Sequence, residues 1–359
     1  MIYIHVPFCR SFCTYCDFYS EMATDNSPFS AYTNQVCAEI RKRSGEVDDT
    51  LKTLYFGGGT PSLLPLSSLS RILLTLEECG HGGPYTEFTL EVNPEDIVEK
   101  GLPYVQSLKA LGVNRISIGV QSFDDNLLRW MNRRHNAERA EQAFHIVREA
   151  GIDNISLDLI FGLSNLSDQV WEDTIDKAVA LGPEHISCYQ LTIEGDNALA
   201  HMLETGEYEE APEELCRKQY DTLCRKLAAA GFKHYEISNF AREGFETLHN
   251  SGYWSRRPYV GFGPAAHSFS GRGRSWNESA LTDYSHTEES LSVEDEKVET
   301  LMLALRTAKG VDMDFLRGNC REEDIRRLEK AGALRLEGRR YRIPEDHFFV
   351  SDEIIRELI

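Results

Sequence analysis

The sequence has no continuous run of about eighteen apolar residues, which is the length that a helix needs to cross a bilayer. Its first residues, MIYIHVPF, contain neither a basic start nor a long apolar segment, so they do not resemble a secretory signal. Basic residues are also scarce: 38 lysines and arginines against 58 acidic residues leave a formal net charge of -20. We therefore expect a cytoplasmic protein without a transmembrane segment and without a broad basic surface for nucleic acid.

Cysteines are present, but they are unevenly distributed. Six of the nine are scattered and are expected to be small, buried apolar residues, reduced in the cytosol: Cys37, Cys79, Cys188, Cys216, Cys224 and Cys320. The other three, Cys9, Cys13 and Cys16, lie in FCRSFCTYCDF with the spacing C-x3-C-x2-C. Thiolates suit zinc or iron–sulfur clusters. His5 could serve as a fourth zinc ligand, although it lies inside a predicted strand, so both interpretations stay open.

Short apolar runs alternate with amphipathic segments along the first two thirds of the chain. The runs cover residues 2–6, 52–56, 88–92, 115–120, 155–161 and 185–193. Helix-like segments between them end at glycines, where a left-handed C-cap residue is expected: Gly45, Gly80, Gly112, Gly151, Gly182 and Gly231. Six β-then-α units predict right-handed crossovers and a parallel sheet, either open or closed into a barrel.

Polar and glycine residues cluster where the predicted strands end. The segment GGGTP (57–61) follows the second run, ENP (91–93) closes the third, and QS (121–122) follows the fourth. Asp158 interrupts the fifth run, and the cysteine segment follows the first. Because active sites of barrel-like α/β folds form at the carboxyl ends of the strands, we expect these features to meet at one rim.

The pattern changes after about residue 241. Residues 249–279 are rich in glycine and aromatic residues and are expected to form loops, and the polar segment 285–297 suggests a boundary. The remainder predicts two helices and a hairpin around Gly338. We therefore expect a core at 1–241, a loop-rich extension at 242–292 and a small winged-helix-like module at 293–359. Because that module is rich in acidic as well as basic residues, we do not expect it to bind DNA.

Five motifs resemble one known family over nearly the whole chain. They are YIHVPFCRSFCTYCDF, YFGGGTPSLL, EVNPEDI, ISIGVQSF and LDLIFGL, and they resemble the coproporphyrinogen dehydrogenase-like (HemN/HemW) branch of the radical S-adenosylmethionine (SAM) proteins. The resemblance implies a partial (β/α)6-type radical SAM barrel. It also implies a [4Fe–4S] cluster held by Cys9, Cys13 and Cys16, whose remaining iron binds SAM. A zinc or purely structural site stays as the alternative.

The resemblance further implies a set of SAM-binding residues, namely Tyr3, Tyr15, Gly58, Gly59, Thr60, Glu91, Gln121, Arg133 and Asp158. Glycines permit close approach of the backbone to a ligand. If Arg133 and Asp158 both face the rim, they are natural partners. Alternatively, Glu91 and Gln121 satisfy only backbone groups, and Arg133 is a solvated surface arginine. The chain departs from the family at Asn132, where glycine is usual, and at Ser164, where proline is usual.

The branch contains an oxygen-independent coproporphyrinogen III dehydrogenase and a haem chaperone. The enzyme has a further cysteine where this chain has Phe18, and it has an extension before the cysteine segment, whereas eight residues precede Cys9 here. The resemblance therefore favours a haem chaperone that binds haem, the cluster and SAM. It would deliver haem to haemoproteins, with membrane-associated respiratory proteins as one candidate class. The alternative is the dehydrogenase, which converts two propionates to vinyl groups.

The segment HNSGYW (249–254) is similar to the H-N-x-x-Y-W motif of those chaperones. An imidazole is an ordinary axial ligand of haem iron, and nearby aromatic rings could pack on the macrocycle. The motif therefore suggests His249 as a haem ligand. The alternative is a histidine that orders its own loop.

Overall fold

The computed structural model describes residues 1–25, 27–193, 195 and 197–359. Its main sheet has the strand order β11-β1-β4-β5-β6-β7-β8-β10-β9. Six of these strands coincide with the six predicted runs: β1 (Ile2–Val6), β4 (Thr53–Gly58), β5 (Glu87–Val92), β6 (Arg115–Gln121), β7 (Asn154–Phe161) and β8 (His185–Gln190). They pair in parallel throughout. The predicted partial (β/α)6 barrel is therefore confirmed.

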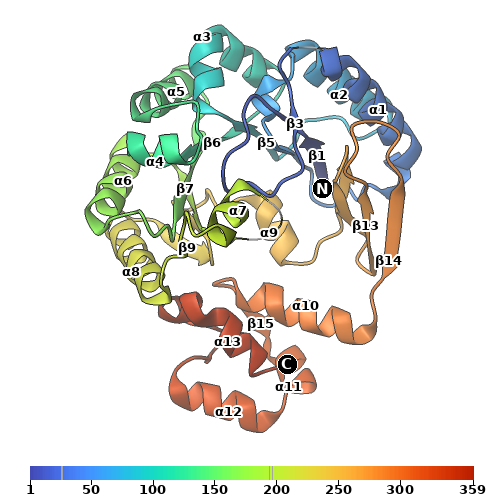
Figure 1. The fold of residues 1–359 in the computed structure, drawn as a ribbon. Helices are drawn as coiled ribbons and strands as arrows, with labels where there is room; N and C mark the ends of the chain where they lie inside the picture. The colour runs from blue at the N-terminus through green and yellow to red at the C-terminus, as the bar shows by residue number, and fades with distance from the viewer. Residues whose placement is uncertain (26, 194, 196) are drawn as a thin grey trace.

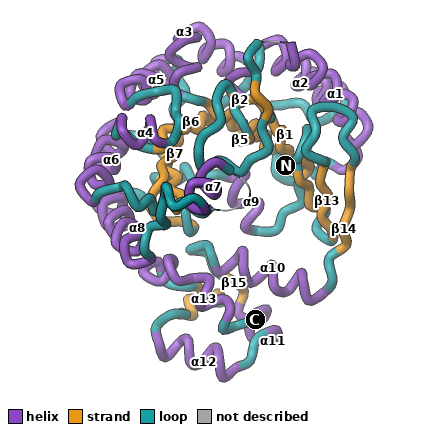
Figure 2. Tube along the Cα trace, in the orientation of Figure 1, coloured by secondary structure: helices purple, strands orange, loops and turns teal. Residues whose placement is uncertain are grey.

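Helices follow these strands, and all except α7 lie around the outside of the sheet, whereas α7 lies in the middle of the ring beside the cysteine segment (Figures 1 and 2). They are α1 (Ser27–Arg43), α2 (Leu66–Glu78), α3 (Pro94–Ala110), α4 (Asp125–Trp130), α5 (Ala137–Glu149), α6 (Asp168–Leu181), α7 (Ala198–Glu204) and α8 (Glu213–Ala229). Strand side chains alternate between two faces. On β6, Ile116 and Ile118 are fully buried in the hydrophobic core. Ser117 lies on the opposite face, toward the interior of the barrel, and lines a cavity there.

The glycine prediction holds at five of six positions. Gly80, Gly112, Gly151, Gly182 and Gly231 all have left-handed φ angles. Gly45 does not, because the chain continues from α1 into a short 3-10 helix, Ser44–Glu46. The Arg43 side chain holds that turn through an ion pair of 2.8 Å to Glu46.

The prediction of loops over 249–279 is wrong. This segment contains α9 (Leu248–Trp254), β11 (Val260–Phe262), β12 (His267–Phe269) and β13 (Gly273–Asn277), and β14 (His286–Ser290) follows. β11 pairs in parallel with β1 and extends the main sheet, while β12, β13 and β14 form a separate antiparallel sheet. Strands of three to five residues are too short to show a hydrophobic period, and the partner of β11 is far away in the sequence.

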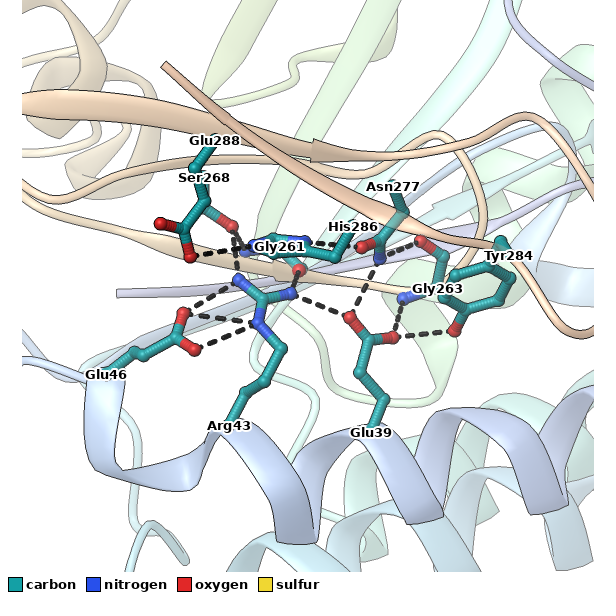
Figure 3. A network of polar contacts seen from close by, with 10 residues as sticks. All are labelled: Glu39, Arg43, Glu46, Gly261, Gly263, Ser268, Asn277, Tyr284, His286 and Glu288. Atoms are coloured by element: carbon teal, nitrogen blue, oxygen red, sulfur yellow. Dashed lines mark hydrogen bonds and ion pairs between the residues drawn. The ribbon is translucent and has the colours of Figure 1, made fainter. Parts of the chain in front are cut away.

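A buried polar network attaches this second sheet to α1 (Figure 3). Arg43 forms an ion pair of 2.7 Å with Glu39, and it also donates to Ser268 at 3.0 Å. Glu39 in turn accepts hydrogen bonds from Asn277 at 2.8 Å and from Tyr284 at 2.6 Å. Because Arg43 and Glu39 are both buried, the network fixes the extension beside the first strand of the barrel.

At the other edge of the main sheet, β10 (Asn239–Ala241) pairs antiparallel with β8, and β9 (Lys233–Glu236) pairs with the outer side of β10.

The C-terminal part of the chain contains α10 (Val293–Leu305), β15 (Val311–Asp312), α11 (Met313–Asn319), α12 (Glu322–Ala331), β16 (Arg335–Glu337), β17 (Arg340–Arg342) and α13 (Ser351–Arg356). Its small sheet has the order β15-β17-β16, with the predicted hairpin turn at Gly338. Helix, strand, two helices and hairpin agree with the winged-helix-like prediction.

We retain the three-part division at residues 241 and 292 as a proposal, although β11 of the middle part is built into the main sheet. Within the described ranges, none of the helices is both long enough and apolar enough to span a membrane.

Candidate functional site

A cavity of about 1160 Å³ opens at the carboxyl ends of the parallel strands. Its walls come from the cysteine segment, from the ends of β4, β5 and β6, and from β7 and β8. Eleven of the predicted site residues line it: Cys9, Cys13, Tyr15, Cys16, Gly58, Gly59, Thr60, Glu91, Gln121, Arg133 and Asp158. The polar residues expected at one rim therefore do meet there. Their role in binding SAM remains a prediction.

The three cysteines lie on one loop that two short strands hold at its base. β2 (Phe8–Cys9) pairs with β3 (Glu21–Met22), so the loop leaves and returns at the same place. All three cysteines are free and half-buried. Burial raises the pKa of Cys9, and it raises that of Cys16 to about 11. Burial therefore favours the neutral thiol at Cys9 and Cys16, and a bound metal would have to displace the protons of these two.

His5 is not free to act as a fourth metal ligand. Its Nδ1 lies 3.0 Å from the Tyr3 hydroxyl, and its Nε2 lies 3.0 Å from the Tyr19 carbonyl oxygen. Across the described residues, no three His, Cys, Asp or Glu side chains converge closely enough to enclose a single metal ion. Three thiols in one roomy cavity, without a fourth protein ligand, fit a larger cluster with an open coordination position better than a closed zinc site.

Arg133 connects the cysteine loop to the sheet. Its Nη1 donates to the Cys13 sulfur at 3.4 Å, and its Nη2 donates to Asn93 Oδ1 at 2.6 Å and to the Gly119 carbonyl at 2.7 Å. The alternative of a solvated surface arginine is therefore wrong. The expected pairing with Asp158 is not seen among the described residues either: Nη1 and Nη2 donate to these other acceptors, and Nε has no partner.

Both departures from the family pattern have a local explanation. Asn132 adopts a left-handed φ of 57°, which asparagine tolerates better than most residues, and its Nδ2 donates to the Phe12 carbonyl at 2.7 Å. Ser164 donates its backbone N–H to the Tyr208 hydroxyl at 3.2 Å, a bond that proline could not form. Asn132 therefore adds a second link between this turn and the cysteine loop.

The glycines of GGGTP are required by the protein's own packing. Gly58 has a φ of 111°, and a Cβ there would lie 2.6 Å from the His5 ring. At Gly59 a Cβ would lie 2.8 Å from the Phe8 carbonyl oxygen. These residues bring β4 close to the first strand and to the start of the cysteine loop. Close approach to a ligand is therefore not needed to explain them.

Two of the acidic residues that line the cavity, Glu91 and Asp158, have hydroxyl or backbone partners. Glu91 accepts from the Tyr55 hydroxyl at 2.6 Å and from the Gly58 N–H at 3.1 Å. Asp158 accepts from the Ser117 hydroxyl, at 2.9 Å to Oδ1 and 3.0 Å to Oδ2. Burial raises the pKa of Asp158, and it raises that of Glu91 to about 7. Glu91 is thus able to hold or release a proton near neutral pH.

Gln121 ends β6 with a φ of 65°, next to a register shift in the pairing with β7. An asparagine or glycine would enter this conformation more readily, so the backbone is strained at the rim. Strain of this kind is common at ligand sites. A ligand-binding role for Gln121 stays a prediction.

Two predicted residues are absent from the cavity wall, Tyr3 and His249. His249 is fully buried: its Nδ1 lies 2.8 Å from the Thr53 hydroxyl, and its Nε2 lies 2.7 Å from the Tyr253 hydroxyl. Burial also lowers the pKa of His249 to about 3. With both nitrogens engaged, it cannot reach haem iron in this structure. The prediction of a haem ligand is therefore corrected to the alternative, a histidine that orders α9.

Sequence reasoning overlooked several residues of the wall. Asn93 receives the Arg133 hydrogen bond, and Arg115, Tyr189 and Asn250 also line the cavity. Asn93 stood within the quoted ENP segment and could have been found. For Arg115 the sequence offered a weaker indication. In the predicted strand it alternates onto the same face as Ser117, Gly119 and Gln121.

Three proteins of known name are similar to this chain over most of its length. Heme chaperone HemW of Synechocystis is 37% identical over 86% of this chain and 78% of its own. HemW of Bacillus subtilis is 35% identical over 86% and 84%, and HemW of Mycobacterium tuberculosis is 30% identical over 100% and 94%. Residues 3–178 also match the Radical SAM superfamily. This chain belongs to the HemW/HemN family of radical SAM proteins.

The fold agrees with that assignment. The solved structure of coproporphyrinogen III oxidase (HemN) from Escherichia coli superposes with a TM-score of 0.82, covering 99% of this chain and 89% of its own. At 19% identity, this likeness concerns the fold alone. Members of the family thus share one scaffold, and function has to be argued from the site.

Proposed function

We propose that this protein is a haem chaperone, which binds haem together with a [4Fe–4S] cluster and SAM and delivers the haem to haemoproteins. The observation that carries this proposal is the similarity, over 86% to 100% of the chain, to proteins named heme chaperone. The match to the Mycobacterium tuberculosis protein, at 30% identity, covers the whole chain and so extends well beyond the superfamily match at residues 3–178.

The geometry of the cavity supports the cluster part of the proposal. Cys9, Cys13 and Cys16 would hold the cluster, and SAM would occupy the open position beside it. Bound there, the cluster and SAM would supply reductive radical chemistry, and the residues of this chain would hold and orient them. Arg133 would keep the Cys13 loop in place, and its positive charge would favour the thiolate.

The haem part rests on the cavity and its surroundings. A volume of about 1160 Å³ is large for a small-molecule site, since typical pockets measure roughly 300–1,000 Å³. Three aromatic side chains on its wall remain exposed: Phe12 at 47%, Phe18 at 68% and Tyr189 at 44%. Exposed rings beside a large cavity suit a flat apolar macrocycle. Because His249 is enclosed, we no longer propose it as the axial ligand.

The test is a transfer experiment with the full chain, reconstituted anaerobically with its cluster. Haem binding is followed by the Soret band, and the loaded protein is then mixed with apomyoglobin as the acceptor probe. We expect a saturable Soret change and the appearance of the holomyoglobin spectrum faster than from haem bound to albumin. A protein that neither binds nor transfers haem would overturn the proposal.

A second assay separates the chaperone from the enzyme alternative. Coproporphyrinogen III is supplied with SAM and reductant, and products are read by mass, with 5′-deoxyadenosine as the internal proof of a competent cluster. The chaperone proposal predicts SAM cleavage without decarboxylated product. Loss of CO2 from the propionates would establish the dehydrogenase instead and would make Phe18 a tolerated departure.

A further inference from the structure

Arg115 lies at the inner end of the cavity, away from the cysteines. It begins β6 and shares a strand face with Ser117 and Gly119, both of which line the cavity with it. Glu91 pairs in register with Ser117, so Arg115 stands two residues deeper in the barrel than Glu91. Two residues of strand correspond to about 6.6 Å. The rim carries the cysteines, and Arg115 forms part of the floor.

This guanidinium is buried and without a direct partner. The Arg115 residue is 2% exposed. Its Nε has no hydrogen-bond partner, and in the described part of the chain the guanidinium forms no ion pair either. The register partners of Arg115 on the two neighbouring strands are Thr89 and Asn154, and each of them also leaves a buried side-chain oxygen unsatisfied. One level of the barrel thus gathers three incompletely satisfied polar groups.

The acidic residues nearby do not neutralise Arg115 by contact. Glu91 and Asp158 lie within electrostatic reach of it, but their oxygens are occupied by Tyr55, Gly58 and Ser117. A buried charge without a hydrogen-bonded partner is strongly unfavourable. The protein keeps one on the wall of this cavity, where an occupant of the cavity could pair with it.

We infer that Arg115 is a carboxylate-binding residue at the floor of the cavity. The planar guanidinium matches a carboxylate through two parallel hydrogen bonds, and burial strengthens each of them. The inference rests on the proposed function, because the two molecules that could supply the carboxylate are haem, through a propionate, and SAM, through its amino-acid carboxylate. In the proposed function the SAM carboxylate belongs with the cluster at the rim. A propionate is therefore the expected partner of Arg115.

The experiment compares each ligand with an analogue that lacks the carboxylate. The probes are haem against haem dimethyl ester, and SAM against decarboxylated SAM. Each is titrated into the reconstituted wild type and into Arg115→Met. Loss of a charged hydrogen-bonded pair typically weakens binding by about tenfold or more. We expect Arg115→Met to bind haem at least about tenfold more weakly, while the dimethyl ester binds both proteins with equal, reduced affinity.

Controls separate binding from folding and from bulk charge. Arg139→Met removes an exposed arginine outside the cavity wall and should leave all affinities unchanged, whereas Arg115→Lys should restore part of the haem affinity. Melting curves check that each variant folds. If Arg115→Met does not fold, the wild-type comparison of haem with its dimethyl ester still decides, because equal affinities would overturn the inference.

Each remaining outcome has one meaning. If Arg115→Met weakens the binding of SAM but not of decarboxylated SAM, and leaves haem binding unchanged, Arg115 binds a carboxylate and that carboxylate belongs to SAM. If the wild type binds both haem and SAM and Arg115→Met binds them with the same affinities, the carboxylate-binding role is overturned. The proposed function then still stands. Failure of the wild type to bind haem overturns the proposed function itself, and the propionate assignment with it.

Discussion

Arg133 and Arg115 face the same cavity, and the Nε of each lacks a partner among the described residues, but the partners of their terminal nitrogens differ. Arg133, at the rim, donates to a cysteine sulfur, an asparagine and a backbone carbonyl. Arg115, at the floor, is more deeply buried and has no such acceptor. An arginine whose donors are used by the protein positions other groups. An arginine with free donors on a cavity wall is available to a ligand.

The two arginines also differ in how much the sequence indicates about them. Arg133 was identified through a family resemblance, and its contacts explain why it is there: it supports the loop that carries Cys13. Arg115 begins an otherwise apolar strand, and nothing in its sequence context shows whether it is paired. The three predictions below test whether the rim and the floor differ as described.

The largest effect is expected at the rim, from Cys13→Ser. A serine hydroxyl is a poor ligand for iron, so the variant should lose the visible absorbance of the reconstituted cluster. The matched control is Cys79→Ser, which removes a half-buried thiol outside the cavity and should retain the absorbance. Full retention of the cluster in Cys13→Ser would remove this cysteine from the ligand set.

An intermediate effect is expected on stability, measured by urea unfolding of the cluster-free protein. Arg133→Met should lower the free energy of unfolding by about 2 kcal/mol, because it leaves Asn93 and the Gly119 carbonyl without their donor. Arg115→Met should change it by less than about 1 kcal/mol, or even increase it, because it replaces an unpaired buried charge by an apolar chain. A loss as large as that of Arg133→Met would show that the floor arginine is structurally paired.

The smallest effect concerns Glu91 and the pH dependence of stability. Burial raises its pKa from 4.5 to about 7 in the folded protein, so the folded state holds the proton more tightly than the unfolded state. Stability from this group is therefore complete below about pH 4.5 and is lost as the pH rises through about 7. Glu91→Gln should remove that slope and gain about 1–2 kcal/mol over the wild type between pH 5 and pH 8.

Urea unfolding at a series of pH values measures this difference, with Glu99→Gln as the exposed control. The result bears directly on Arg115. A tight ion pair between Glu91 and Arg115 would hold the pKa of Glu91 below its ordinary value. The contribution of Glu91 to stability would then increase, not decrease, as the pH rises. A difference between wild type and variant that does not change with pH would contradict the raised pKa.

Much of the fold followed from local pattern. All six predicted runs became neighbouring parallel strands, because short apolar segments between amphipathic helices have few alternatives to a parallel sheet. The convergence of Cys9, Glu91 and Asp158 followed from the same logic, since carboxyl ends of parallel strands share one edge. The family resemblance added the expectation that the three thiols hold an iron–sulfur cluster.

Other predictions failed where partners are distant in sequence. Residues 249–279 were expected to be loops, yet β11 completes the sheet beside β1, and the buried Arg43–Glu39 pair fixes the neighbouring strands to α1 (Figure 3). His249 carried a ligand motif, but Thr53, almost 200 positions earlier, occupies one of its nitrogens. Neither contact can be predicted from the local residue pattern, because the partners are far apart in the sequence.

The amino-acid sequence by itself determined the barrel, the cysteine loop and the set of polar groups at the rim, because these depend on local periodicity and on strand ends. Only the tertiary structure decided which of those groups are already satisfied. Whether an arginine, a histidine or a carboxylate is free depends on the donors and acceptors that folding brings within about 3 Å of it. At Arg133 and His249 those partners are present, and at Arg115 the cavity takes their place.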